Sequence, residues 1–204
     1  VSEKQSEIIA AKYSIRTVFV QNDPLHKKWN AVVKLAQPDR PDYCLFMGSD
    51  DFANGTLIRE YARRMALPNA AGYLATLDWY FFDTATKNGL YWAGYRENYR
   101  HGEPCGAGRA LSAAVLDKID WCPWIPGYDG MLDTAFQKQM KGIPHTKDFF
   151  NLRDVEGAVG LDIKTGVNMT PFRAWDNTST YEVVPFLLKA FDETTTNKIL
   201  ELKP

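Results

Sequence analysis

Apolar residues recur at helical spacing in several segments of the chain. In residues 25–36 one helix face would carry Leu25, Trp29, Val32, Val33 and Ala36. Residues 2–13 follow the same period, and Ser2 supplies a capping residue ahead of an acidic first turn. The same pattern predicts further helices at about residues 54–65, 110–119, 130–141, 181–191 and 194–202.

Short apolar runs predict strands. Residues 43–47 are continuously apolar, which suits a buried strand. An Asn-Gly pair at residues 88–89 lies between two apolar segments, a strong signal for a β-hairpin. Its strands would fall in residues 74–79 and 90–95, with Trp79 and Trp92 packing the hairpin. Two more strands are expected at residues 17–20 and 161–164.

The order of these elements predicts an α/β fold: a mixed, mainly parallel sheet flanked by helices. The chain has 204 residues, the size of one ordinary domain with a substantial core. We expect one domain over residues 1–148 and a C-terminal extension over residues 149–204, to which the sequence assigns no chemical role. With 24 basic and 25 acidic residues, the chain is neither a polycation nor a disordered tail, although a local nucleic-acid-binding patch remains possible.

The cysteines and the longest apolar runs bear on the cellular setting. Cys44, Cys105 and Cys122 are odd in number and lack CxxC spacing, so we expect buried thiols rather than disulfides or a zinc site. No apolar run reaches the ~18 residues of a membrane helix. A protein without a transmembrane segment, in the reducing cytoplasm, is therefore the expectation.

Adjacent carboxylates at Asp50 and Asp51 directly follow the predicted strand at residues 43–47. Side-by-side anions repel each other unless a cation or hydrogen-bond donors neutralise them. A hard divalent ion that also binds phosphate oxygens would do so. The alternative is that the two residues cap the following helix, because Asp is a favoured N-cap residue. Taken alone, the pair leaves both interpretations open.

The stretch from residue 43 to residue 51 resembles family 2 glycosyltransferases, in which a strand is followed by a small turn, Asp-x-Asp-Asp and a helix. The resemblance implies a GT-A fold, the nucleotide-diphospho-sugar transferase type, and Mg²⁺ or Mn²⁺ held by Asp50 with Asp51. Ser49 and Asp51 would contact the donor. Lys28 and Asn30 match a basic residue and an Asn that the family places near the nucleotide. Gly48 stands where the family has its first Asp, so weak or dispensable metal binding is possible.

Further short motifs continue the resemblance up to about residue 148. Gly108 and Arg109 match a small-residue segment on the acceptor side, where a glycine permits close approach of a ligand and an arginine meets phosphate. A tight turn with a solvated Arg109 is the structural alternative. Trp124 would stack on a sugar or base, or pack in the core together with Trp121. His145 is a candidate further ligand to the metal or pyrophosphate, although a lone histidine is more often structural.

An inverting transfer needs a base that takes the proton of the acceptor hydroxyl. Asp129 matches the family's Asp at a helix start and is our first candidate, while Asp133, one turn later, is the second. Asp129 as a simple N-cap is the alternative. The family's opening strand, which holds the nucleotide base, has no counterpart in this chain.

The sequence thus predicts an inverting, metal-assisted glycosyltransferase that uses a nucleotide-sugar donor. Its acceptor is unknown and could be a saccharide, a lipid-linked sugar, a protein or a modified nucleobase. An oligomer is possible. The competing hypothesis is a non-catalytic binding or assembly module with a GT-A-like fold, which would explain the loss of the first Asp at Gly48. A nucleotidyltransferase is disfavoured, because no Gly-rich phosphate loop follows the first predicted strand.

Overall fold

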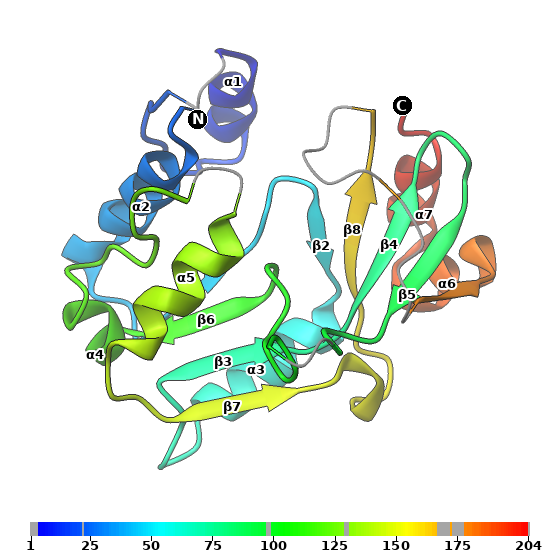
Figure 1. Ribbon diagram of the computed structural model, residues 1–204. Coiled ribbons are helices and arrows are strands. Elements are labelled where there is room, and N and C mark those ends of the chain that lie inside the picture. Colours follow the sequence, from blue (N-terminus) through cyan, green and yellow to red (C-terminus); the bar gives the residue numbers. More distant parts are fainter. Residues whose placement is uncertain are drawn as a thin grey trace. The chain divides into compact units, whose positions relative to one another are not determined.

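The computed structural model in Figure 1 describes residues 4–21, 23–96, 99–128, 131–166, 172 and 178–203, without the side chain of Gln5. The chain forms two compact units. The first unit contains residues 1–44 and 111–146, and the second contains residues 45–110 and 147–204. The predicted boundary after residue 148 falls inside strand β7 (Lys147–Phe150). Residues 147–204 belong to the same compact unit as residues 45–110.

The first unit is mainly helical in its described part. Helix α2 begins and ends as the apolar period predicts, and α1 lies within its predicted range. The strand expected at residues 17–20 is absent, because residues 15–21 pair with no strand and Phe19 is 62% exposed. That prediction was wrong: a short apolar run forms a strand only beside a neighbour. The elements are α1 (Lys4–Lys12), α2 (Leu25–Ala36), η1 (Gln37–Asp39), α4 (Ala113–Asp117) and α5 (Leu132–Lys141).

Helix α4 starts three residues later than its expected start. Residues 109–112 form strand β6 (Arg109–Ser112), and Ser112 then caps α4 by accepting a hydrogen bond from the Val115 amide. A buried apolar run fits a strand and a helix equally well, so periodicity alone could not separate them. Trp121 follows α4, is fully buried, and donates from Nε1 to Asp117 at 2.9 Å. For Trp121 the core-packing alternative is confirmed.

The strands of the described residues form two sheets rather than one. A four-stranded sheet has the order β1-β6-β3-β7, and a five-stranded sheet has the order β2-β8-β4-β5-β9. The passage of the chain between the two units falls within β1 and within β6. The remaining strands are β1 (Tyr43–Phe46), β2 (Asp51–Ala53), β3 (Tyr73–Thr76), β4 (Trp79–Asp83), β5 (Gly89–Trp92), β8 (Gly160–Lys164) and β9 (Thr178–Tyr181).

Strand directions correct the predicted sheet. The mixed α/β class is confirmed, but a mainly parallel sheet is not. In the five-stranded sheet, β4 and β8 are parallel, whereas β2 with β8, β4 with β5, and β5 with β9 are antiparallel. In the other sheet, β3 and β7 are parallel. In the five-stranded sheet antiparallel pairing dominates: β5 follows β4 through a tight turn, and β9 pairs with the other edge of β5.

A hairpin is present, and Trp79 lies opposite Trp92 across β4 and β5, but its first strand is Trp79–Asp83 rather than the predicted residues 74–79. The segment at residues 74–79, expected as one strand, is divided between two sheets at Asp78. Asp78 is fully buried, and its carboxylate accepts hydrogen bonds from the Leu152 amide at 2.5 Å and the Tyr91 hydroxyl at 2.8 Å. Burial raises its pKa, and these hydrogen bonds offset part of the rise. The carboxylate thus ties the break between β3 and β4 to η2 (Leu152–Asp154).

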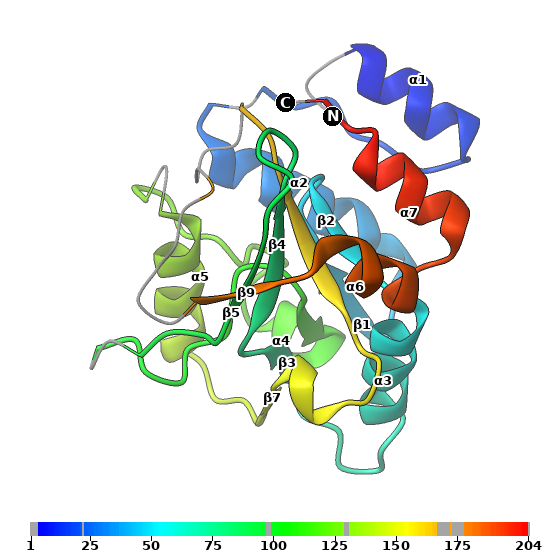
Figure 2. The same cartoon turned by 90° about the vertical axis from the view of Figure 1, so that its right-hand side faces the viewer.

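Two C-terminal helices cover one face of the five-stranded sheet (Figure 2). These are α6 (Val183–Ala190), which lies within its predicted range, and α7 (Glu193–Leu200), which begins one residue before its predicted range. Phe82, Ile163, Leu187 and Ile199 belong to one buried cluster that joins β4 and β8 to the two helices. The second unit therefore has its own hydrophobic core.

The cysteines are only partly as expected. All three are free thiols, and Cys105 is buried, with Sγ 3.0 Å from the Thr76 hydroxyl. Cys44 and Cys122 are only half-buried, which corrects the expectation of three buried thiols. Cys122 is thus accessible for chemistry that Cys105 is not.

Candidate functional site

The adjacent carboxylates lie where the loop after β1 meets β2, with Asp50 in the loop and Asp51 in the strand. Helix α3 (Gly55–Met65) is capped by Asn54, whose Oδ1 accepts from the Leu57 amide at 3.0 Å. The interpretation of Asp50 and Asp51 as helix caps is therefore wrong, because strand β2 lies between them and the helix. Asp51 is instead the first residue of that strand.

Pairing of β2 with β8 brings a third carboxylate to the loop. Asp51 lies directly opposite Asp162 in this antiparallel pair, so the two side chains share one face of the sheet. Asp51 Oδ2 accepts from the Gly48 amide at 2.6 Å, and Asp162 Oδ2 accepts from Lys164 Nζ at 2.6 Å. We call Asp50, Asp51, Asp162 and Lys164 the acidic cluster, which belongs entirely to the second unit.

Gly48 leaves the space into which two of these carboxylates point. A Cβ atom built on Gly48 would lie 2.7 Å from Asp50 Oδ1 and 2.8 Å from Asp51 Oδ2. Both distances are shorter than any ordinary contact, so a side chain here would displace the carboxylates. The two oxygens therefore converge over Gly48, and the absence of a side chain at this position is what permits the arrangement.

Burial makes the acidic cluster electrostatically costly. Burial, followed by the nearby charge of Asp162, raises the pKa of Asp51 to about 7. Burial also raises the pKa of Asp162 to about 6, although Lys164 opposes the rise. Asp162 Oδ1 is buried and accepts no hydrogen bond from the described residues. The cluster is therefore short of positive charge and of donors near neutral pH.

Sequence reasoning missed Asp162 and Lys164. Their alternation within the apolar run at residues 160–164 places them on one face of a strand, which was a usable signal. What the sequence could not show is that this strand pairs with residues 51–53, more than 100 positions earlier. Ser49, predicted to contact the donor, lies exposed in the loop itself.

Gly108 and Arg109 serve the interior of the second unit. Gly108 has a positive φ of 73°, and a Cβ there would lie 3.0 Å from the Tyr61 hydroxyl and 3.2 Å from the Trp79 ring. Its close approach is thus to the protein's own side chains. Arg109 is only 1% exposed and donates to the Pro104 carbonyl at 3.3 Å. The alternative of a solvated Arg109 is therefore wrong.

In the first unit, Asn30 and Trp124 are structural partners. Asn30 Nδ2 donates to the Trp124 carbonyl at 2.8 Å, and Asn30 Oδ1 accepts from the Trp124 amide at 3.1 Å. The Trp124 ring is 5% exposed and contacts the rings of Trp29 and Phe136 at centroid distances of 5.1 and 5.4 Å. Core packing, one of the two alternatives for Trp124, is what the structure shows. Lys28 is half-buried on α2.

The two candidate bases are described unequally. Asp129 lies outside the described residues. Asp133 lies half-buried in the first turn of α5, where the helix dipole favours a negative charge. His145 lies after α5, with Nδ1 2.8 Å from the Ile143 carbonyl oxygen, so this ring nitrogen contacts the backbone.

Comparison with known proteins leaves the family undetermined: no protein-family model matches the sequence, and no curated protein gives a match. Among the described residues, no group of three or more His, Cys, Asp or Glu side chains is arranged to hold a metal ion. No helix within this part of the chain combines the length and apolar character needed to span a membrane.

Proposed function

We propose that the chain is part of a nucleotide-sugar-dependent glycosyltransferase of the GT-A type. The observation that carries the proposal is the convergence of Asp50 and Asp51 over Gly48 at the end of a strand. The resemblance of residues 43–51 to family 2 glycosyltransferases gives this geometry its chemical meaning. In the proposal, the acidic cluster binds the diphosphate of the donor through a divalent cation.

The acidic cluster fits Mg²⁺ or Mn²⁺ as a partial site. Such ions commonly take only one or two protein carboxylates and complete their shell with phosphate oxygens and water. Asp50 Oδ1 and Asp51 Oδ2 are hard oxygen donors that approach the same point. The buried Asp162 Oδ1 accepts no hydrogen bond from the described residues, so a nearby cation would stabilise its charge. A full cage of protein ligands is not needed for an ion that arrives with the diphosphate. When bound, the ion would supply charge neutralisation for the leaving group.

The remaining chemistry belongs to a base. It removes the proton of an acceptor hydroxyl while the hydroxyl oxygen bonds to the anomeric carbon, and the bond from that carbon to the nucleoside diphosphate breaks. We assign this role to Asp133 or Asp129. A carboxylate in the first turn of α5 suits it, because the helix dipole favours the ionised form that a base needs.

Two residues predicted to contact the ligand have structural roles instead. Arg109 is buried and bonds to a backbone carbonyl, so it supports the strand rather than the phosphates. Asn30 is engaged with Trp124 on both sides of its amide, so it shapes the first unit. Lys28 and Ser49 remain as donor contacts, and His145 remains a secondary candidate.

Turnover of nucleotide sugars tests the proposal. Purified protein would be given a panel of nucleotide sugars with Mn²⁺, Mg²⁺ or a chelator, and release of nucleoside diphosphate would be measured. We expect release with at least one donor, lowered in Asp50→Ala. A non-catalytic binding module predicts binding without release for every donor, and binding that survives the chelator unchanged would also argue against the metal-assisted mechanism.

A further inference from the structure

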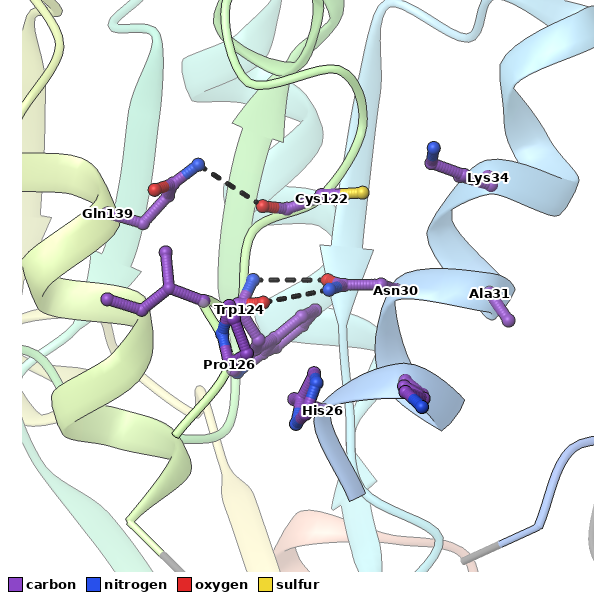
Figure 3. A pocket seen from close by; sticks show the side chains of 10 residues that line it. His26, Asn30, Ala31, Lys34, Cys122, Trp124, Pro126 and Gln139 are labelled. Carbon is purple, nitrogen blue, oxygen red and sulfur yellow. Dashed lines mark hydrogen bonds between the residues drawn. The ribbon is translucent and has the colours of Figure 1, made fainter. Parts of the chain in front are cut away.

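A hollow of about 530 Å³ lies in the first unit (Figure 3), and none of its lining residues belongs to the acidic cluster. One wall is a face of α2 that includes His26, Lys27 and Lys34. The opposite side is the loop at residues 122–126, with Gln139 of α5 beside it. We call this space the basic hollow. Its volume falls within the ~300–1,000 Å³ typical of sites for small molecules.

The walls of the basic hollow are held in place before any ligand arrives. The two hydrogen bonds between Asn30 and Trp124 join α2 to the loop, as Figure 3 shows. Gln139 Nε2 donates to the Cys122 carbonyl at 3.4 Å, which joins the loop to α5. Because these contacts are already formed, a ligand would not have to order the site, and binding avoids that entropic cost.

The charge of the lining is positive. Lys27 and Lys34 both line the hollow, and its described lining contains no Asp or Glu. The two lysines are seven residues apart on α2, so their Cα atoms are about 10 Å apart along the axis and both side chains can reach one anion. Lys28 is two positions from His26, about 200° around the helix, and does not line the hollow.

Lys34 already holds a replaceable carboxylate. Its Nζ lies 3.0 Å from Asp120 Oδ2, and the Asp120 side chain is 81% exposed. Exposed ion pairs contribute little, because water competes for both groups. A hydrogen bond from Lys34 to Asp120, and the neighbouring Cys122, raise the pKa of Lys34, so its charge is retained. A ligand phosphate could thus take the place of the carboxylate.

We propose that the basic hollow binds a small organic phosphate without a metal ion. Its phosphate would lie between Lys27 and Lys34, and its less polar body would contact Ala31 and Ile125. The proposal does not depend on glycosyl transfer or on the acidic cluster. Asn30 and Trp124 also line the hollow, and their paired hydrogen bonds would keep its shape when the ligand binds.

Cys122 provides a direct reporter, because its half-buried thiol lines the hollow. In a Cys44→Ser variant, an aromatic disulfide would label Cys122: the thiolate forms a mixed disulfide and an aromatic thiolate leaves. Cys105 is 4% exposed and should react much more slowly. The double variant Cys44→Ser/Cys122→Ser measures that background.

The experiment follows the labelling rate of Cys122 with phenyl phosphate or inorganic phosphate, in the presence of a chelator. At about ten times its dissociation constant, phenyl phosphate should slow labelling ~10-fold, because only about one site in eleven is free. Lys27→Gln and Lys34→Gln should weaken this protection, and Asp120→Asn should strengthen it. Lys198→Gln, on the exposed face of α7, is the matched control and should not change it.

Three results would overturn the proposal. The first is no protection by phenyl phosphate at any accessible concentration. The second is protection that persists unchanged in Lys34→Gln, which would place the anion elsewhere. The third is equal protection by inorganic phosphate, which would show that Ala31 and Ile125 contact no organic body. Because every arm contains a chelator, loss of divalent-cation binding at the acidic cluster cannot imitate any of them.

Discussion

The acidic cluster and the basic hollow differ in the burial of their charged side chains. In the second unit, Asp51 and Asp162 are largely buried, and burial raises the pKa of both. In the first unit, Lys27 and Lys34 are exposed at the rim of a space with polar and apolar walls. Buried like charges are costly to the fold until a ligand relieves them, whereas exposed cations cost the fold little. Ligands at the two places should therefore affect stability very differently.

The largest predicted change is in turnover, on substitution of the candidate base in the first unit. Asp133→Asn should lower turnover ~100- to 10,000-fold if Asp133 is the base, which is the usual contribution of general-base catalysis. Donor affinity should persist, since Asn keeps the shape of the side chain. Transfer rate and nucleotide-sugar affinity would be measured in one preparation, with Asp129→Asn alongside. A loss at Asp129 alone would move the base to that residue, and normal rates in both variants would leave the first unit without the catalytic base.

The next prediction compares how much one asparagine in each unit contributes to the free energy of unfolding. Asn54 makes four side-chain hydrogen bonds, to Leu57, Gly157, Val159 and Ala190, whereas two are formed between Asn30 and Trp124. Buried groups left without a partner cost ~1–3 kcal/mol each, with incomplete additivity. We expect Asn54→Ala to cost on the order of 3–4 kcal/mol and Asn30→Ala about 1–2 kcal/mol. Urea unfolding of the two variants tests this, and a larger cost at Asn30 would contradict the contrast.

The pH dependence of stability should report the acidic cluster. The pKa values of Asp51 and Asp162 are raised in the folded state, to about 7 and about 6. Protonation of these two carboxyl groups therefore stabilises the folded state, and this contribution to the free energy of unfolding is complete below about pH 4. It is lost as the pH rises through those two values. Glu60 behaves oppositely: its hydrogen bond with Arg63 lowers its pKa to about 2, so its contribution is lost only in strong acid. Between pH 5 and 8 the free energy of unfolding should therefore fall.

Asp162→Asn should flatten that fall, since it removes one buried charge and lowers the repulsion felt by Asp51. The free energy of unfolding at pH 5 and at pH 8 would be compared between wild type and variant. Asp154→Asn, at an exposed position in η2, is the control and should leave the fall unchanged. An equal fall in wild type and Asp162→Asn would mean that the cluster is not the source.

Local patterns predicted much of the fold. Helix α2 was predicted to the residue, because its apolar face repeats over three turns. The Asn88-Gly89 pair predicted the hairpin, although Gly89 is already the first residue of β5 and the turn lies ahead of it, at residues 84–88. The predictions for residues 17–20 and 109–112 were wrong for a common reason: a four-residue run is too short for its period to distinguish a strand from a helix or a loop.

The candidate site was half predictable. Asp50 and Asp51 were visible as adjacent carboxylates after a buried strand. Asp162, Lys164 and the opening over Gly48 depend on the pairing of β2 with β8, which no local pattern encodes. The buried position of Arg109 and the engagement of Asn30 with Trp124 are likewise tertiary results. A polar residue in a motif looks the same in sequence whether it faces a ligand or the core.

In the proposed function, Asp50 and Asp51 converge on a cation that arrives with a diphosphate. The most direct measurement is the thermal midpoint with and without Mn²⁺ plus a nucleoside diphosphate, in wild type, Asp50→Ala and the exposed control Glu156→Ala. At 100 times the dissociation constant the ligands should add about 2.7 kcal/mol to the wild type and to Glu156→Ala. Asp50→Ala should show little or no shift. An equal shift in all three proteins would contradict the account, because Asp50 would then play no part in binding.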